Sequence, residues 1–148
     1  MGDIADFDPE AALGVWLERA KRRSERHAVV LLAEADAAGE PSGDVTAAAQ
    51  ALGALLRHGD QIWIWRGEPN RAVILLTAVT DLPTAAEVTR RLLATLDPPG
   101  PVAGVTLLQP GEGIDSLLRR VEGAWLLATD GGDGQVATSP VLGRSSAP

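Results

Sequence analysis

The sequence predicts an α+β domain with a ferredoxin-like, palm-type two-layer fold. Apolar runs of strand length alternate with stretches of helical periodicity, and two of these runs are joined by a five-residue turn. A chain of 148 residues, 45% of them apolar, suffices for one domain with its own core. After a leading helix the expected order is βαββαβ, followed by an extra helix and an edge strand. Helices are therefore expected to cover one face of a mixed sheet.

A leading helix is expected from residues 8–10 (DPE) to the basic run at residues 21–23 (KRR). Asp8 can cap the helix, proline is tolerated in its first turn, and cations suit the negative end of the helix dipole. Its apolar residues repeat at helical spacing and form one face: Ala12, Leu13, Trp16, Leu17 and Ala20. The short apolar run His27–Ala33 (HAVVLLA) then predicts a buried central strand.

The middle of the chain predicts a loop, a helix and a β-hairpin. Residues Ala37–Ser42 contain glycine and proline, which indicates a loop, and Val45–Leu56 has the spacing of a second helix. The hairpin strands are Gln61–Arg66 and Arg71–Thr77. The turn between them spells RGEPN.

Further elements complete the sheet and cover it. They are a helix from Pro83 to the residue before Asp97, a strand at Val102–Leu108, a helix at Ile114–Thr129 and a short edge strand at Gln135–Thr138. The folded domain is expected to span residues 1–136. Residues 137–148 are expected to form a disordered tail because they become polar and rich in glycine, proline and serine.

The composition excludes several kinds of function. A net charge of −7 and a pI near 4.7 argue against general binding to DNA, RNA or an anionic membrane. A local basic patch can still hold one small anion. The absence of cysteine excludes disulfides and thiolate metal sites and fits a reducing cytoplasm. The acidic N-terminal segment lacks the apolar stretch of a secretory signal, and no run of 18 apolar residues suggests a membrane span.

Several short motifs resemble those of the diguanylate cyclase (GGDEF) family in order and spacing. The matching segments are Asp8-Pro9 with Leu13, residues 33–36 (AEAD), Gly43-Asp44, residues 121–129 (VEGAWLLAT) and residues 134–136 (GQV). The family's name-giving motif lies in a hairpin turn, and here that turn consists of Arg66, Gly67, Glu68, Pro69 and Asn70. The resemblance extends from about Asp8 to Val136 and implies the palm-type fold named above.

The resemblance also implies where a catalytic site would lie. Metal-binding carboxylates come from the first strand and from the third motif position, where Glu34 and Glu68 stand, so two oxygen ligands for Mg²⁺ could survive. No cofactor is otherwise required. The next motif position, an acid in active cyclases, is Pro69. Arg66 replaces a glycine against which the nucleotide lies, although its charge could instead hold a phosphate.

A second departure lies between Asp36 and Asp44, where the connection is shorter than in the family. The missing piece carries the family's guanine-reading asparagine and a lysine near the phosphates, and the family's late lysine is Thr129 here. Phosphoryl transfer depends on a metal, on positioning and on positive charge around the triphosphate. Cyclase activity is therefore not expected. An enzyme with an altered metal groove remains an alternative.

Arg57 and Asp60 resemble the R-x-x-D of the family's inhibitory site, which binds cyclic di-GMP away from the catalytic turn. A guanidinium suits this ligand because it can fork onto a phosphate or stack on a base. The family adds an arginine from the helix after the hairpin, where Arg90 and Arg91 stand. Simpler interpretations stay open: Arg57 suits a helix end, Asp60 shapes a turn, and the arginine pair is a solvated face.

The first hairpin strand places Trp63 and Trp65 on one face and Ile62 and Ile64 on the other. If the isoleucines point into the core, the tryptophans form an exposed pair that marks a partner or base-stacking surface. Alternatively, the tryptophans are core, and the isoleucines are covered by a second subunit or by the N-terminal helix.

The favoured hypothesis is a catalytically inactive GGDEF-like domain that binds cyclic di-GMP through Arg57, Asp60 and Arg90 or Arg91. It would act as a signalling effector through a protein partner or a homodimer. The alternatives are a nucleotide-independent interaction module and a nucleotide cyclase or other nucleotidyltransferase with an altered metal site. Neither His27 nor His58 has the sequence partners of a metal or general-base site.

Overall fold

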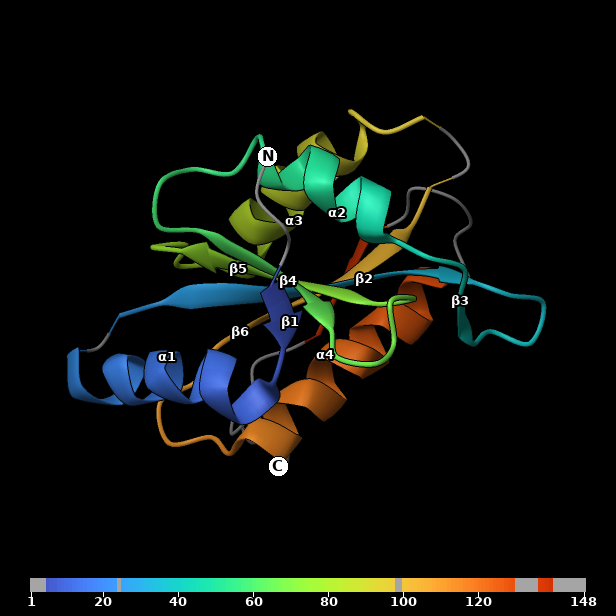
Figure 1. Cartoon of the computed structure of the whole chain (residues 1–148). Helices are drawn as coiled ribbons and strands as arrows, with labels where there is room; N and C mark the ends of the chain where they lie inside the picture. Colours follow the sequence, from blue (N-terminus) through green and yellow to red (C-terminus); the bar gives the residue numbers. More distant parts are fainter. Residues whose placement is uncertain (1–4, 24, 98–99, 130–135, 140–148) are drawn as a thin grey trace, which may run out of the picture.

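The computed structural model describes residues 5–23, 25–97, 100–129 and 136–139 and shows a mixed sheet with helices on both faces (Figure 1). In chain order the elements are β1 (Ala5–Phe7), α1 (Pro9–Arg23), β2 (His27–Ala35), β3 (Pro41–Ser42), α2 (Thr46–Gly53), β4 (Gln61–Trp65), β5 (Ala72–Thr77), α3 (Leu82–Leu93), β6 (Val102–Leu107), α4 (Ile114–Thr129) and β7 (Val136–Thr138). None of the described helices combines the length and apolar content that a bilayer crossing needs.

The expected α+β, ferredoxin-like class is confirmed by the sheet. The βαββαβ core consists of β2, α2, β4, β5, α3 and β6, and its strands lie in the order β4-β5-β2-β6 with every pair antiparallel. Two short strands extend this core: β1 pairs parallel with β4 at one edge, and β7 pairs parallel with β6 at the other. β3 folds back antiparallel onto the end of β2.

The helices lie on both faces of the sheet, with α2 and α3 on one face and α1 and α4 on the other (Figure 1). Successive side chains of β2 point to opposite faces of the sheet and so contribute to two hydrophobic cores. Val30 and Leu32 belong to the first core, on the side of α2 and α3, whereas Val29 and Leu31 belong to the second, on the side of α1 and α4. The expected helical cover of one face therefore holds for the βαββαβ core. The two added helices bury the opposite face, which explains why β2 is apolar without interruption from Ala28 to Ala33.

Most predicted boundaries agree with the structure. The first and last helices have the expected extents, and β2 continues two residues past Ala33 to Ala35. The second helix is shorter than the predicted Val45–Leu56, because hydrogen bonds of the i→i+3 type tighten the chain after Gly53. At the C-terminal end, Ser139 is buried and its N–H donates to Val105, so the folded part continues past the expected boundary at residue 136. The rest of the predicted tail, residues 140–148, lies outside the described residues.

The sequence pattern did not predict β1, which decides the environment of the hairpin tryptophans. Phe7 is 1% exposed, and its ring centroid lies 5.7 Å from that of Trp63 and 4.8 Å from that of Trp65. Both tryptophans are half-buried against the second core, and Ile64 is buried in the first. Because both faces of β4 are covered, the exposed aromatic pair is not observed.

Candidate functional site

The R-x-x-D pair forms a compact cluster at the open end of the β4–β5 hairpin. Arg57 and Asp60 precede β4, and Thr77 ends β5, so the hairpin brings the three residues together. Asp60 accepts hydrogen bonds from Arg57 Nε at 3.1 Å and from Arg57 Nη2 at 3.2 Å. This is the bidentate geometry that a carboxylate and a guanidinium favour. We call Arg57, Asp60 and Thr77 the arginine clamp.

Thr77 holds both other members of the clamp. Its backbone N–H and its hydroxyl donate to Asp60 Oδ1 at 2.8 and 2.9 Å, and its carbonyl accepts a hydrogen bond from Arg57 Nη2. The side chain of Asp60 is only 2% exposed, whereas that of Arg57 is 57% exposed. The carboxylate is thus the buried anchor, and the guanidinium is the part of the clamp that solvent reaches.

The electrostatics of Asp60 follow from these contacts. Burial by itself would raise the pKa of Asp60, but hydrogen bonds from Arg57 and Thr77 favour the ionised form and hold the pKa below its usual value. The carboxylate therefore stays charged at neutral pH and keeps Arg57 in place.

The clamp leaves Arg57 with donors to spare. A guanidinium carries five N–H groups, of which Nε uses one and Nη2 uses two within the clamp. Among the described residues, no hydrogen bond or ion pair engages Nη1 of Arg57. Both oxygens of Asp60, in contrast, already accept hydrogen bonds. An anion can bind the pre-oriented guanidinium, whereas a ligand N–H could reach Asp60 only after clamp bonds open.

Thr77 was not among the predicted site residues, although hairpin register could have located it. Gln61 pairs with Leu75, so extending the antiparallel register by two residues places Thr77 opposite Gly59. Gly59 has φ of +97°, and a Cβ there would lie 3.4 Å from the Thr77 hydroxyl. The tight turn before β4 therefore depends on a glycine at this position.

The two further predicted ligand residues, Arg90 and Arg91, lie in the last turn of α3. Both pair with Glu87 of the same helix, Arg90 at 3.6 Å and Arg91 at 3.2 Å, and both are exposed. α3 begins at Leu82, and Arg90 lies about 12 Å further along the helix axis. No described contact joins this pair to the clamp, so their role in ligand binding stays a prediction.

The RGEPN turn lies at the other end of the same hairpin. Gly67 has φ of +73°, and backbone bonds from Glu68 to Trp65 and from Arg71 to Glu68 close the turn. The carbonyl of Pro69 accepts from the N–H of Val45 at 2.9 Å. The turn is thereby attached to the start of α2. Arg66, the first residue of the turn, is exposed.

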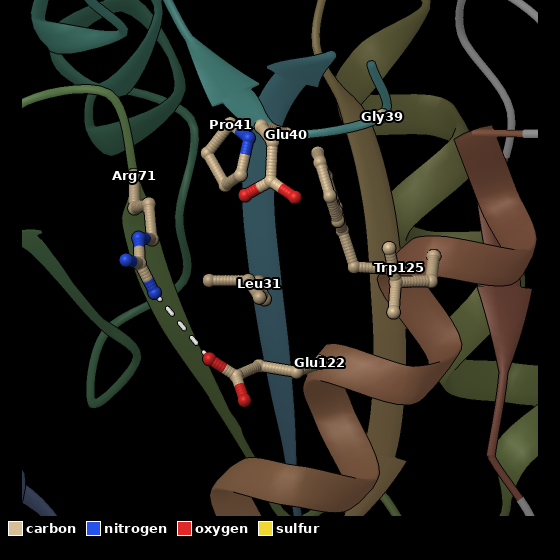
Figure 2. A pocket seen from close by; sticks show the side chains of 8 residues that line it. Leu31, Gly39, Glu40, Pro41, Arg71, Glu122 and Trp125 are labelled. Atoms are coloured by element: carbon tan, nitrogen blue, oxygen red, sulfur yellow. Dashed lines mark hydrogen bonds and ion pairs between the residues drawn. The ribbon is translucent and has the colours of Figure 1, made fainter.

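A groove of about 210 Å³ opens beside this turn, and Figure 2 shows the side chains around it. Its lining comes from β2, the β2–β3 connection, β3, the hairpin and α4. The lining residues are Leu31, Gly39, Glu40, Pro41, Arg71, Glu122, Trp125 and Leu126. We call this the hairpin groove.

Arg71 lies at the centre of the charges in the hairpin groove. Its guanidinium contacts Glu68 at 2.7 Å and, across the groove, Glu122 at 3.3 Å, as the dashed line in Figure 2 shows. Its Cζ also lies 4.9 Å from the ring centroid of Trp65. The sequence pattern did not single out Arg71 or Glu122, because the two residues lie 51 positions apart and only the fold pairs them.

The short connection after β2 forms one rim of this groove. Asp36 Oδ1 accepts from the N–H groups of Ala38 and Glu40 at 2.8 and 3.0 Å, which organises a tight turn. The chain then returns as β3, where Pro41 pairs with Ala35, so the predicted loop Ala37–Ser42 ends in a short strand. Asp36 therefore shapes the backbone here.

The expected magnesium ligands, Glu34 and Glu68, do not form part of a cluster of three acidic, histidine or cysteine side chains in the described part of the chain. Within the described ranges no three histidine, cysteine, aspartate or glutamate side chains gather closely enough to hold a metal. Glu68 is engaged by the guanidinium of Arg71, and Pro69 supplies no oxygen ligand from its side chain. Magnesium binding at Glu34 and Glu68 stays a prediction, and we derive no step through a metal.

No protein-family model matches the sequence, and no curated protein matches it. Solved structures do resemble the fold. The active GGEEF domain of a diguanylate cyclase from Vibrio cholerae superposes with a TM-score of 0.74 and 15% identity, over 95% of this chain and 99% of that one.

The fold is that of GGDEF domains. A GGDEF domain of DgcB from Caulobacter crescentus, solved in complex with cyclic di-GMP, gives a TM-score of 0.69 at 16% identity, over 93% of this chain and 90% of that one. The diguanylate cyclase SiaD from Pseudomonas aeruginosa, solved with its activator SiaC, gives 0.71 at 23% identity over 87% of this chain. The chain spans 56% of the SiaD chain. At these identities the likeness concerns the GGDEF fold alone.

Proposed function

We propose that this GGDEF-like domain is a catalytically inactive receptor that binds cyclic di-GMP through the exposed guanidinium of Arg57. The observation that carries the proposal is the arginine clamp: Asp60 and Thr77 fix Arg57 and leave its Nη1 donors uncommitted. A fixed guanidinium loses little freedom when it binds a phosphate. The solved DgcB domain holds cyclic di-GMP on the same fold.

The clamp changes the role proposed for Asp60. A carboxylate could accept hydrogen bonds from the N–H groups of a guanine, but the oxygens of Asp60 already accept from Arg57 and Thr77. We assign it the task of orienting Arg57, which contacts a phosphate of the ligand. Arg90 and Arg91 are exposed cations and can neutralise the second phosphate.

The hairpin groove supports the proposal that catalysis is lost. Two carboxylates pair with Arg71, so the charged groups in the groove largely satisfy one another. A triphosphate needs surplus positive charge and a metal, and neither is supplied by this set of residues. When the protein is incubated with GTP or ATP and Mg²⁺, we expect chromatography to show that the nucleotides are unchanged. A cyclic or linear dinucleotide product would contradict this part of the proposal.

Calorimetry with cyclic di-GMP tests the receptor function. We expect binding to the wild type and a loss of about tenfold or more in Arg57→Ala, because a charge-assisted hydrogen bond is removed. Arg22→Ala is the matched control, since it changes the net charge equally at an exposed site of α1. Absence of heat with the wild type, or equal losses in both variants, would refute the proposal.

A nucleotide-independent interaction module is the second candidate, and one observation favours it. Leu126 and Leu127 of α4 are 52% and 61% exposed at adjacent positions, next to the hairpin groove. Contiguous exposed apolar surface can mark a site of protein contact. Here the occupant proposed is a second copy of the chain. Sedimentation should then show a dimer that Leu127→Glu disrupts and that Leu55→Glu, a control at another exposed leucine, does not.

A further inference from the structure

His27 is a buried imidazole beside the arginine clamp. It is the first residue of β2, its side chain is 5% exposed, and it pairs in register with Thr77 of β5. The T-shaped contact of Trp16 with the ring, at 5.1 Å between centroids, closes it off from solvent on the α1 side. The sequence offered no partner for this histidine, and the fold supplies two.

Both ring nitrogens of His27 are engaged, and their partners define the tautomer. Nδ1 accepts a hydrogen bond from the backbone N–H of Ala78 at 3.1 Å. Nε2 lies 3.1 Å from Glu25 Oε1. Because a backbone N–H only donates and a carboxylate only accepts, the neutral ring must carry its proton on Nε2. In this form every polar atom of the ring is satisfied.

Ala78 is a strained position that this hydrogen bond helps to hold. Its φ is +58°, and no other non-glycine residue in the described ranges has a positive φ. An alanine in this region is disfavoured by about 1 kcal/mol or more. Ala78 directly follows Thr77, which holds Asp60 and Arg57 through its N–H, hydroxyl and carbonyl.

We propose that His27 is a proton-sensitive support of the arginine clamp, so that acidification loosens Arg57 and weakens the binding of its ligand. A second proton must go to Nδ1, the nitrogen that accepts from Ala78. The acceptor then becomes a donor and faces another donor, so the Ala78 turn opens. Thr77 shifts with it and releases Asp60. The inference concerns regulation of the binding site and rests on the proposed function.

The charges around His27 act in both directions. Glu25, before β2, accepts from Nε2 and favours an extra proton on the ring. Arg19 and Arg23 of α1 pair with Glu25 at 3.3 and 3.9 Å and oppose that proton. At the end of β5 lie Thr77 and, directly after the strand, Ala78, neither of which is charged. On the β6 side the backbone N–H of Leu108 donates to the carbonyl of His27.

The two described carboxylates nearest the clamp and His27 keep their charge at mildly acidic pH. A hydrogen bond from His27 lowers the pKa of Glu25, and the pKa of Asp60 is lowered as well, so both carboxylates stay ionised above about pH 5. Imidazole is the side chain whose charge ordinarily changes between about pH 5 and pH 8. His58 is exposed and adjacent to Arg57, so the test must remove it.

The experiment uses the full chain carrying His58→Gln. Two-dimensional NMR between about pH 5 and pH 8 follows the Ala78 and Thr77 amides and the Arg57 Nε–H group, together with the His27 ring. We expect these signals to move with one common midpoint. Calorimetry over the same range should show cyclic di-GMP affinity falling about tenfold on acidification. His27→Asn is the matched variant, because its side-chain oxygen can accept from Ala78 without titrating, and its affinity should stay constant.

The outcomes separate this inference from the proposed function. A His27 ring that titrates while the Ala78 amide stays still, or a ring that stays neutral throughout, overturns the inference. Tight binding of cyclic di-GMP with one affinity at every pH also overturns it and leaves the proposed function standing. If the NMR signals share one midpoint but cyclic di-GMP does not bind, the link between His27 and the clamp is supported and the proposed function is refuted. If His27→Asn fails to fold, the NMR titration of His58→Gln decides alone.

Discussion

A Cβ added to Gly104 would lie 2.3 Å from the backbone nitrogen of Trp125. Helix α4 therefore rests directly on β6, and this close approach also places the indole Nε1 of Trp125 3.0 Å from the carbonyl of Ala33 on β2. Any side chain at residue 104 must push the helix away from the sheet, because the nearest atoms belong to the backbone of α4.

Gly104→Ala is accordingly expected to destabilise the domain by about 3 kcal/mol, the upper range for overpacking in a core. Chemical denaturation followed by circular dichroism would measure this. Gly123→Ala is the matched control in α4, since a Cβ there meets nothing within 4 Å. It should leave stability unchanged or raise it by about 0.5–1 kcal/mol through helix propensity. Equal effects of the two substitutions would contradict the close packing.

A buried ion pair provides the second prediction. Glu112 and Arg120 contact each other at 2.5 Å with side chains 3% and 9% exposed, and Arg120 also donates to the carbonyl of Leu107. Glu112→Ala removes the carboxylate that balances a buried cation and should cost about 3–5 kcal/mol. Glu87→Ala, which removes only exposed pairs with Arg90 and Arg91, should cost less than about 0.5 kcal/mol in the same urea titration.

The arginine clamp should make stability depend on acid pH. The pKa of Asp60 is lower in the folded protein than in the unfolded chain, so its contribution is complete above about pH 4 and is lost as the pH falls through the folded value. Asp60→Asn should cost about 1–2 kcal/mol at neutral pH. The difference in unfolding free energy between wild type and Asp60→Asn should shrink below about pH 4. A gap between wild type and variant that stays constant to low pH would speak against the clamp.

The N-terminal strand should be needed to shield the hairpin tryptophans. Phe7→Ala removes a ring that contacts both Trp63 and Trp65, and the lost burial should destabilise the domain by about 3–4 kcal/mol. The tryptophan emission should shift to longer wavelength as the two indoles meet water. Val15→Ala, at an exposed position of α1, is the control and should change neither quantity. Unaltered emission in Phe7→Ala would argue against the pairing of β1 with β4.

The strand and helix order was predictable because long periodic segments carry their own signal. β2 has an unbroken apolar run from Ala28 to Ala33, and the apolar residues of α4 repeat at helical spacing over its sixteen residues. β1 and β3 contain three and two residues, too few for any period, and they exist only because a neighbouring strand offers hydrogen bonds. Such short strands can be located only once the rest of the sheet is known.

The candidate site divides in the same way. Arg57 and Asp60 could be proposed from the sequence because they are three residues apart and resemble a known motif. Thr77 and the pair of Arg71 with Glu122 come from distant segments, which the hairpin register and the packing of α4 bring together. Charged residues at long separation give no local pattern, so the groove could not be assembled before the fold was known.

The parallel pairing of β1 with β4 has a mechanical consequence. Chain that enters the domain at Ala5 is joined to the same hairpin that bears Arg57 near one end and the RGEPN turn at the other. A force applied to the chain at Ala5 would load the hydrogen bonds between β1 and β4 in shear, before the force reached either hydrophobic core. A force on the chain that leads into β1 would therefore be transmitted directly to the β4–β5 hairpin.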